Sequence, residues 1–165
     1  MSLSNSLLPE FDQEMANTRK VLERMPMDRY DWKPHDRSFS LGKLATHVAH
    51  LPGWLTMTLA TDELDIGQPF QQPTPKTTGE LLELFDQTAA QARASLAGAA
   101  DEEFFKKWSL RNGDHVIFTM PKIAVVRGVV LNHLIHHRGQ LTVYLRLNDV
   151  PVPGLYGPSA DEGSF

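Results

Sequence analysis

The sequence of 165 residues contains no cysteine. Structural disulfides, thiolate zinc sites, iron–sulfur clusters and a cysteine nucleophile are therefore excluded. A metal site in this chain has to use imidazole or carboxylate ligands, and the chain has seven histidines. Chemistry that needs a thiol has to take that thiol from outside the protein.

The sequence also lacks a basic leader, a long apolar run and a basic stripe. Its first residues, MSLSNSLLPEFDQEM, do not have the pattern of a signal peptide. No stretch approaches the roughly 20 apolar residues of a membrane helix. The formal net charge of −4 disfavours a nucleic-acid partner. We expect a cytoplasmic protein with a single domain over residues 1–165 and with neither a nucleic acid nor a membrane as partner.

Apolar residues recur at helical spacing in several segments. We expect helices over residues 4–25, 41–55, 78–96 and 122–147. Ser40 and Thr78 can cap the second and third of these helices, and Pro121 suits the first turn of the last one. Residues 26–40 and 62–77 are polar or rich in proline and are expected to be connections.

Asn112-Gly113, between two short apolar runs, is typical of a β-hairpin. We expect two short strands near residues 108–118 and a short helical turn within residues 101–108. The proline- and glycine-rich residues 151–165 are expected to be irregular. The predicted fold class is all-α, a four-helix bundle with long connections and a small β-hairpin.

Three histidines fall where a helical bundle normally has aliphatic side chains. His133 and His137 lie about 40° apart on one face of the last predicted helix. The residues within about 60° of His133 on this face are Val126, Val129, Val130, Gln140 and Tyr144. Since this face is mostly apolar, we expect it to point into the bundle. His47 lies between Leu44 and Leu51 on the apolar stripe of the second predicted helix.

A divalent metal would compensate for burying these imidazoles, each of which costs about 1–3 kcal/mol without a partner. Histidines at i and i+4 can bind one ion, and a third histidine from a facing helix leaves a coordination position open. The HxxxH spacing alone is weak evidence, and core histidines that hydrogen-bond to one another, to Tyr or to Gln are the alternative. We expect His50 and His136 to flank the stripes, and His35 and His115 to be exposed in loops.

Three stretches together resemble the DinB superfamily. They are LGKLATHVAHL around His47, HLIHHRGQL from His133, and the tail VPVPGLYGP from Val150. The resemblance covers nearly the whole chain and implies a four-helix bundle that is often a homodimer. It implies that His47, His133 and His137 bind a divalent metal, zinc or nickel. The superfamily includes transferases that use bacillithiol or mycothiol, although most members have no established substrate.

These observations favour a metal-dependent thiol S-transferase that acts on small electrophiles, with an external low-molecular-weight thiol as co-substrate. A coordinated thiol is deprotonated, so this scheme needs no general base. His50, Gln140 and Tyr144 are the candidate residues for orienting the substrate. The alternatives are a metal-dependent hydrolase, for which no acid–base partner is evident, a non-enzymatic metal- or ligand-binding stress-response protein, and a bundle without metal.

Overall fold

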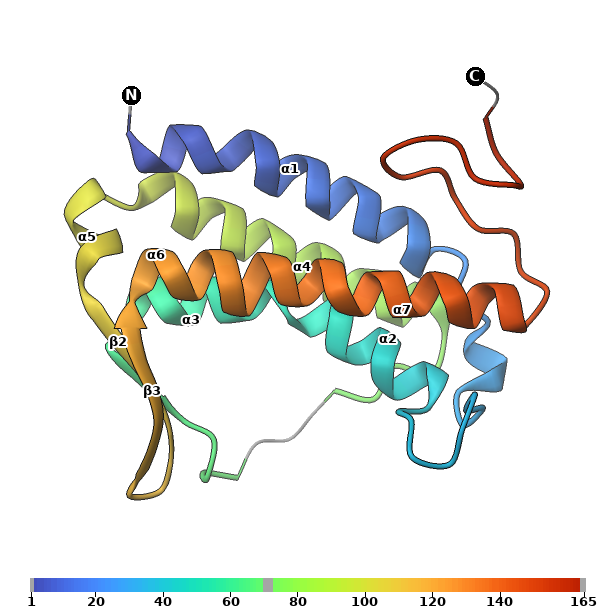
Figure 1. The fold of residues 1–165 in the computed structure, drawn as a ribbon, viewed down its shortest axis with the longest axis horizontal. Coiled ribbons are helices and arrows are strands. Elements are labelled where there is room, and N and C mark those ends of the chain that lie inside the picture. The colour runs from blue at the N-terminus through green and yellow to red at the C-terminus, as the bar shows by residue number, and fades with distance from the viewer. Residues whose placement is uncertain (1, 70–72, 164–165) are drawn as a thin grey trace.

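The computed structural model describes residues 2–69 and 73–163, which are mostly helical with one small sheet (Figure 1). The helices are α1 (Leu3–Leu22), α2 (Leu41–His50), α3 (Pro52–Ala60), α4 (Thr78–Gly98), α5 (Asp101–Phe105), α6 (Lys122–Ala124) and α7 (His133–Leu147). A 3₁₀ turn η1 (Met27–Arg29) and a π-helix η2 (Val125–Asn132) are also present. Of the described helices, none is both long and apolar enough to span a membrane.

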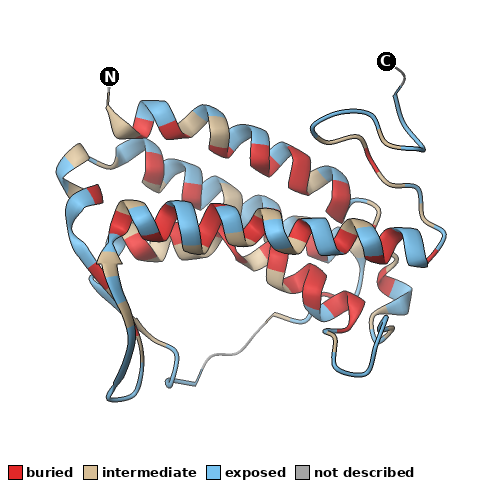
Figure 2. Ribbon diagram, viewed as in Figure 1, coloured by how far each residue is buried: buried red, intermediate tan, exposed pale blue. Residues whose placement is uncertain are grey.

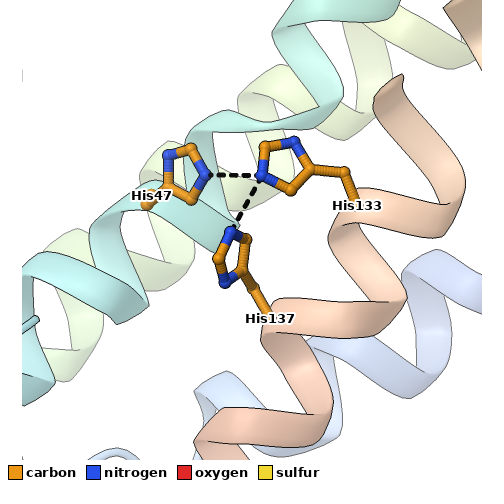
Figure 3. A group of neighbouring side chains, drawn as sticks. All are labelled: His47, His133 and His137. Carbon is orange, nitrogen blue, oxygen red and sulfur yellow. Dashed lines mark hydrogen bonds between the residues drawn. The ribbon is translucent and has the colours of Figure 1, made fainter. Parts of the chain in front are cut away.

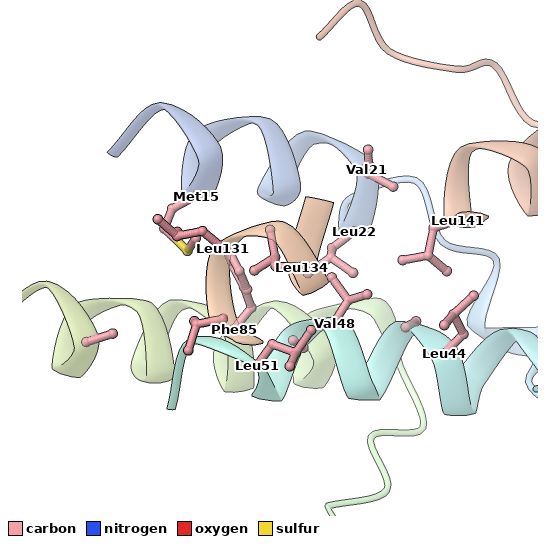
Figure 4. Close-up of a cluster of buried hydrophobic side chains, with 14 of the residues drawn as sticks. Met15, Val21, Leu22, Leu44, Val48, Leu51, Phe85, Leu131, Leu134 and Leu141 are labelled. Atoms are coloured by element: carbon pink, nitrogen blue, oxygen red, sulfur yellow. The ribbon is translucent and has the colours of Figure 1, made fainter. Parts of the chain in front are cut away.

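The core lies between α1, α2, α4 and α7. Both α1 and α2 pack against α4 and α7, while α3 packs against α4 and η2. Buried residues line the sides of the helices that face one another, and exposed residues lie outside (Figure 2). Leu22, Val48, Phe85 and Leu134 are among the side chains of this cluster, each at most 1% exposed (Figure 4). The helical segments predicted from apolar periodicity therefore meet through their apolar faces.

The second predicted helix is divided in two. Ser40 caps α2 as predicted, because its hydroxyl accepts a hydrogen bond from the backbone N–H of Lys43. The continuous helix expected to Leu55 is interrupted between His50 and Pro52, where proline lacks an N–H and starts α3 instead. Gly42 in the first turn has a packing reason, since a Cβ atom there would lie 1.9 Å from Cδ2 of Tyr30.

The last predicted helix is not a uniform α-helix. It consists of α6, the π-helix η2 and α7, and Pro121 ends the preceding strand and flanks α6 rather than lying in its first turn. A helical wheel drawn at 100° per residue assumes one unbroken α-helix, which this segment is not, although Val126 and Val130, both expected on the inward face, are buried. Thr77, not Thr78, caps α4 by accepting from the backbone N–H of Glu80 at 3.1 Å.

The predicted hairpin is confirmed, and the sheet has a third strand. The strands are β1 (Glu63–Asp65), β2 (Lys107–Asn112) and β3 (His115–Pro121). Asn112 pairs with His115, so Gly113 and Asp114 form the two-residue turn, and Gly113 takes a φ of 57° at its first position. The region 62–77, expected to be a plain connection, contains β1, which pairs in parallel with β2. Residues 70–72 of that region and residues 164–165 of the tail lie outside the described residues, and residues 151–163 are irregular as expected.

A buried ion pair fastens the tail and the last helix to α1. The side chain of Arg138 is 2% exposed, and its Nη2 lies 2.7 Å from Oε2 of Glu14. Arg138 also donates to the hydroxyl of Thr18 at 3.2 Å and to that of Tyr156. The Tyr156 hydroxyl in turn donates to Glu14 at 2.8 Å. Each charge in this buried network therefore has a partner, which is the condition under which a buried ion pair is tolerated.

We predict that Arg138→Met destabilises the fold by about 3–5 kcal/mol, because the carboxylate of Glu14 would stay buried without a cation. Urea denaturation followed by far-ultraviolet circular dichroism measures the loss. The double variant Arg138→Met with Glu14→Leu is expected to recover most of the stability, since it removes both charges together. A single variant as stable as the original chain would contradict the prediction.

Candidate metal centre

His47 of α2 and His133 and His137 of α7 converge on one point (Figure 3). The Nε2 atom of His133 lies 3.4 Å from Nε2 of His47 and 2.8 Å from Nε2 of His137. One ligand nitrogen from each histidine lies within 4.8 Å of the other two. Three nitrogens bound to one tetrahedral zinc ion would lie about 3.3 Å apart, given zinc–nitrogen bonds of about 2.0–2.1 Å. The spacing therefore fits a single divalent ion.

Two of the three imidazoles are held by acceptors on their far side. Nδ1 of His133 bonds to the backbone carbonyl of Val129 at 3.2 Å, and Nδ1 of His137 bonds to Oε1 of Gln140 at 2.7 Å. A carbonyl oxygen can only accept, so each Nδ1 carries the hydrogen. Both Nε2 atoms are then left with lone pairs that point towards the centre, as in metal-binding histidines oriented by a second hydrogen bond.

The three histidines are half-buried rather than fully buried. They lie at the edge of the core between α2 and α7, where Leu44 and Leu134 next to them are at most 1% exposed. The histidines were expected on faces that point into the bundle, and the structure places them at the border of its core rather than fully inside it. An ion here would have protein ligands on one side and space for another ligand on the other, which is typical of reactive metal sites.

Burial, followed by the charges of the neighbouring His137 and His133, lowers the pKa of His47 to about 4. Burial is also the main cause that lowers the pKa of His133, followed by the charge of His137. These imidazoles are consequently neutral at pH 7, which is the form that binds a metal.

The structure places the three candidate substrate residues in different surroundings. His50 is half-buried and lines a cavity of about 340 Å³ beside His47, and burial lowers its pKa. Gln140 is exposed rather than on the inward face, with its amide oxygen on His137 and its amide nitrogen 3.2 Å from Nε2 of His136. Tyr144 is buried and donates its hydroxyl to the carbonyl of Phe39 at 3.1 Å. Of the three, His50 alone is among the described residues that line the cavity.

Of the remaining histidines, His136 lies beside the ligand set, with its ring centroid 4.9 Å from that of His137. His35 is exposed in a loop, as expected; His115 is also exposed, although it begins strand β3 rather than lying in a loop. His136 is also exposed, and Gln140 links it to His137. Neither this link nor the role of Val129 was predictable from the sequence, since the first depends on side-chain rotamers and the second on the π-helix. The wall of the cavity that follows β1 was not predicted either, because that region was expected to be a plain connection.

Comparisons with known proteins agree with this fold. A family model described as the DinB family matches residues 1–164. The uncharacterized protein YrdA of Bacillus subtilis strain 168 is 25% identical, over 94% of this chain and 89% of its own length. The crystal structure of a DinB-like protein, YjoA, from Bacillus subtilis superimposes with a TM-score of 0.71 at 20% identity, covering 88% of this chain and 94% of YjoA. A DinB-like protein from Bacillus cereus ATCC 10987 gives a TM-score of 0.72 at 20% identity, covering 92% and 97%.

We predict that Gln140→Ala weakens zinc binding by about 10–100-fold, because it removes the acceptor that orients His137. Competition with a chromophoric zinc chelator measures the affinity. Gln140→Glu keeps an acceptor oxygen and is expected to retain the affinity, and Val143→Ala, an exposed change on the same helix, is the control. Equal affinities for Gln140→Ala and the control would argue against the orienting role.

We predict that the metal-free protein loses stability as the pH falls from about 6.5 to 4, the interval between the ordinary histidine pKa and that of His47. In this interval the unfolded chain binds more protons than the folded one, so stability decreases with decreasing pH. Melting temperatures in the presence of a chelator measure the effect. His47→Leu is expected to make the decrease shallower, whereas His115→Leu keeps it, because His115 is exposed. An identical pH dependence for His47→Leu and the original chain would refute this prediction.

Proposed function

We propose, from the premise that the chain belongs to the DinB family, that it is a metal-dependent thiol S-transferase acting on small electrophiles. The observation that carries the proposal is the convergence of three imidazole nitrogens beside a cavity that His47 also lines. His47, His133 and His137 would hold a divalent ion, zinc or nickel. Such an ion lowers the pKa of a thiol that binds to it, and so supplies a thiolate at neutral pH.

The residues of the chain hold and orient the reactants. Val129 and Gln140 fix the rings of His133 and His137 so that their Nε2 atoms face the centre. The thiol comes from outside, since the chain has no cysteine. In the reaction, the sulfur of the thiolate forms a bond to the electrophilic carbon. A halide then leaves with its electron pair, or an epoxide ring opens and its oxygen takes a proton from water.

The setting of the protein is part of the same proposal. We count α2–α3 and α6–η2–α7 each as one interrupted helix, which with α1 and α4 gives a four-helix bundle. We also propose that the chain acts as a homodimer in the cytoplasm on a small-molecule substrate and has neither a nucleic acid nor a membrane as partner. Light scattering after size-exclusion chromatography measures the oligomeric state.

The experiment is a conjugation assay with zinc- or nickel-loaded protein, 1-chloro-2,4-dinitrobenzene, and bacillithiol, mycothiol or glutathione. A metal-dependent rate above the spontaneous one is expected with at least one thiol. His137→Ala is expected to reduce that rate to background, because it removes a metal ligand. His115→Ala, at the exposed first residue of β3, is expected to retain it.

The other outcomes separate the alternatives. The absence of any metal-dependent rate with all three thiols would overturn the transferase proposal. Hydrolysis of ester or amide substrates without added thiol would indicate a metal-dependent hydrolase. Tight metal binding without any turnover would indicate a non-enzymatic metal- or ligand-binding protein.

A further inference from the structure

The cavity beside His47 has two walls. Helices α2 and α3 form one, and strand β1 with the chain after it forms the other. Its helical wall is a stripe at spacings of three and four residues: His47, His50, Trp54 and Met57. The stripe runs on across the break at Pro52, so α2 and α3 present one surface to the cavity. Its opposite wall is formed by β1 and the residues after it, including Leu64 and Ile66. A volume of about 340 Å³ suits a small organic molecule.

Most of the side chains around this cavity are apolar. Trp54 and Met57 form the part of the helical wall farthest along the stripe from His47, and Leu64 and Ile66 contribute aliphatic groups from the other wall. A tryptophan ring stacks on aromatic ligands, and a methionine sulfur makes favourable contacts with the edges of such rings. The wall therefore matches a flat apolar molecule.

The one carboxylate among the described lining residues, Asp65, is fully engaged with the protein. Its Oδ1 accepts from the backbone N–H groups of Gly67 and Gly113, both at 2.9 Å. Its Oδ2 accepts from Arg111 at 2.9 Å and from Gln68 at 3.1 Å. Arg111 balances the negative charge, and the carboxylate side chain is 9% exposed. Asp65 thus organises the loop and does not offer a charge to a ligand.

The described lining residues include neither lysine nor arginine. An anionic ligand would lose water in this cavity without gaining a counterion, which costs far more than burying a neutral group. A neutral apolar ligand loses little, because its burial is favourable in itself. The charge and the shape of the cavity therefore both favour a neutral, flat, apolar ligand.

We propose that this cavity binds a neutral, apolar, preferably aromatic molecule, and that this molecule is the electrophile of the S-transfer reaction. That the bound molecule is the electrophile rests on the proposed function. That the cavity binds neutral aromatic molecules rests on the cavity alone. His47 lines the cavity and belongs to the metal cluster, so a molecule bound there lies next to the metal. Thiols that carry carboxylates, such as glutathione, would approach from outside this cavity.

The test compares two fluorescent probes that differ by one sulfonate group, N-phenyl-1-naphthylamine and 8-anilino-1-naphthalenesulfonate. Titration of the metal-free full chain gives the two dissociation constants, since a zinc ion held by His47 would itself attract the sulfonate. We expect the neutral probe to bind at least about tenfold more tightly than the sulfonate, because the anion finds no counterion. Equal or tighter binding of the sulfonate would overturn the proposal.

Placing a cation in the cavity is expected to invert this selectivity. Met57→Arg should weaken the neutral probe and strengthen the sulfonate, each by about tenfold. Ile66→Arg, at a position that is 48% exposed, tests the same wall with less disturbance of packing and should act in the same direction. Val143→Arg is the matched control, since Val143 lies on α7 and is 56% exposed, and it should leave both affinities unchanged.

The outcomes distinguish this inference from the proposed function. If Val143→Arg shifts the affinities as much as Ile66→Arg does, or if Ile66→Arg shifts neither, the probes do not bind in this cavity and the inference fails. If the probe results hold but no thiol conjugation is found, the cavity is a site for neutral aromatic ligands and the transferase proposal fails instead. In a working conjugation assay, Ile66→Arg should raise KM for 1-chloro-2,4-dinitrobenzene and leave KM for the thiol unchanged.

Discussion

The packing of α2 against the last helix is the interaction on which the histidine cluster depends. His47 can face His133 only because the apolar residues next to each of them share one buried core. On α2, Leu44 and Val48 flank His47, and on α7 Leu134 follows His133 directly. The buried pair of Arg138 with Glu14 adds a second constraint, because it ties α7 to α1 one residue after His137. The hydrophobic contacts bring the helices together, and the ion pair fixes the rotation of α7.

The π-helix sets the orientation of one ligand. It ends at Asn132, directly before His133, and its carbonyl at Val129 accepts the hydrogen bond from the imidazole of His133. A π-helix is rare and is frequently found at functional sites, and it changes the phase of the residues that follow. Here it separates the buried valines of η2 from the half-buried histidines of α7. The π-helix therefore helps to orient His133, one of the three candidate metal ligands.

The features that were predictable from sequence were those set by local chemistry and by periodicity. The mostly helical class, the cap at Ser40 and the turn at Asn112-Gly113 all follow from residues close together in the chain. The proximity of His47 to His133 and His137 followed from matching positions on two apolar stripes, supported by the family resemblance. The pairing of β1 with β2 was not predictable, because it is a parallel contact between segments more than 40 residues apart. The π-helix was missed because its valine-rich sequence has the same apolar spacing as an α-helix.

Half-burial changes the physical reason for expecting a metal. Fully buried imidazoles would need an ion to offset the loss of hydration, but half-buried rings with bonded Nδ1–H groups do not.

The stronger reason for expecting a metal is the direction of the nitrogen lone pairs. The Nε2 atoms of His133 and His137 lie 2.8 Å apart, and both rings have their hydrogen on Nδ1, so two lone pairs face each other. Such a contact is repulsive unless a positive charge lies between the two nitrogens. A shared proton can join two nitrogens, whereas His47 directs a third towards the same place, 3.4 Å from His133. A divalent ion binds all three nitrogens at once, so the third imidazole is what favours a metal over a proton at this site.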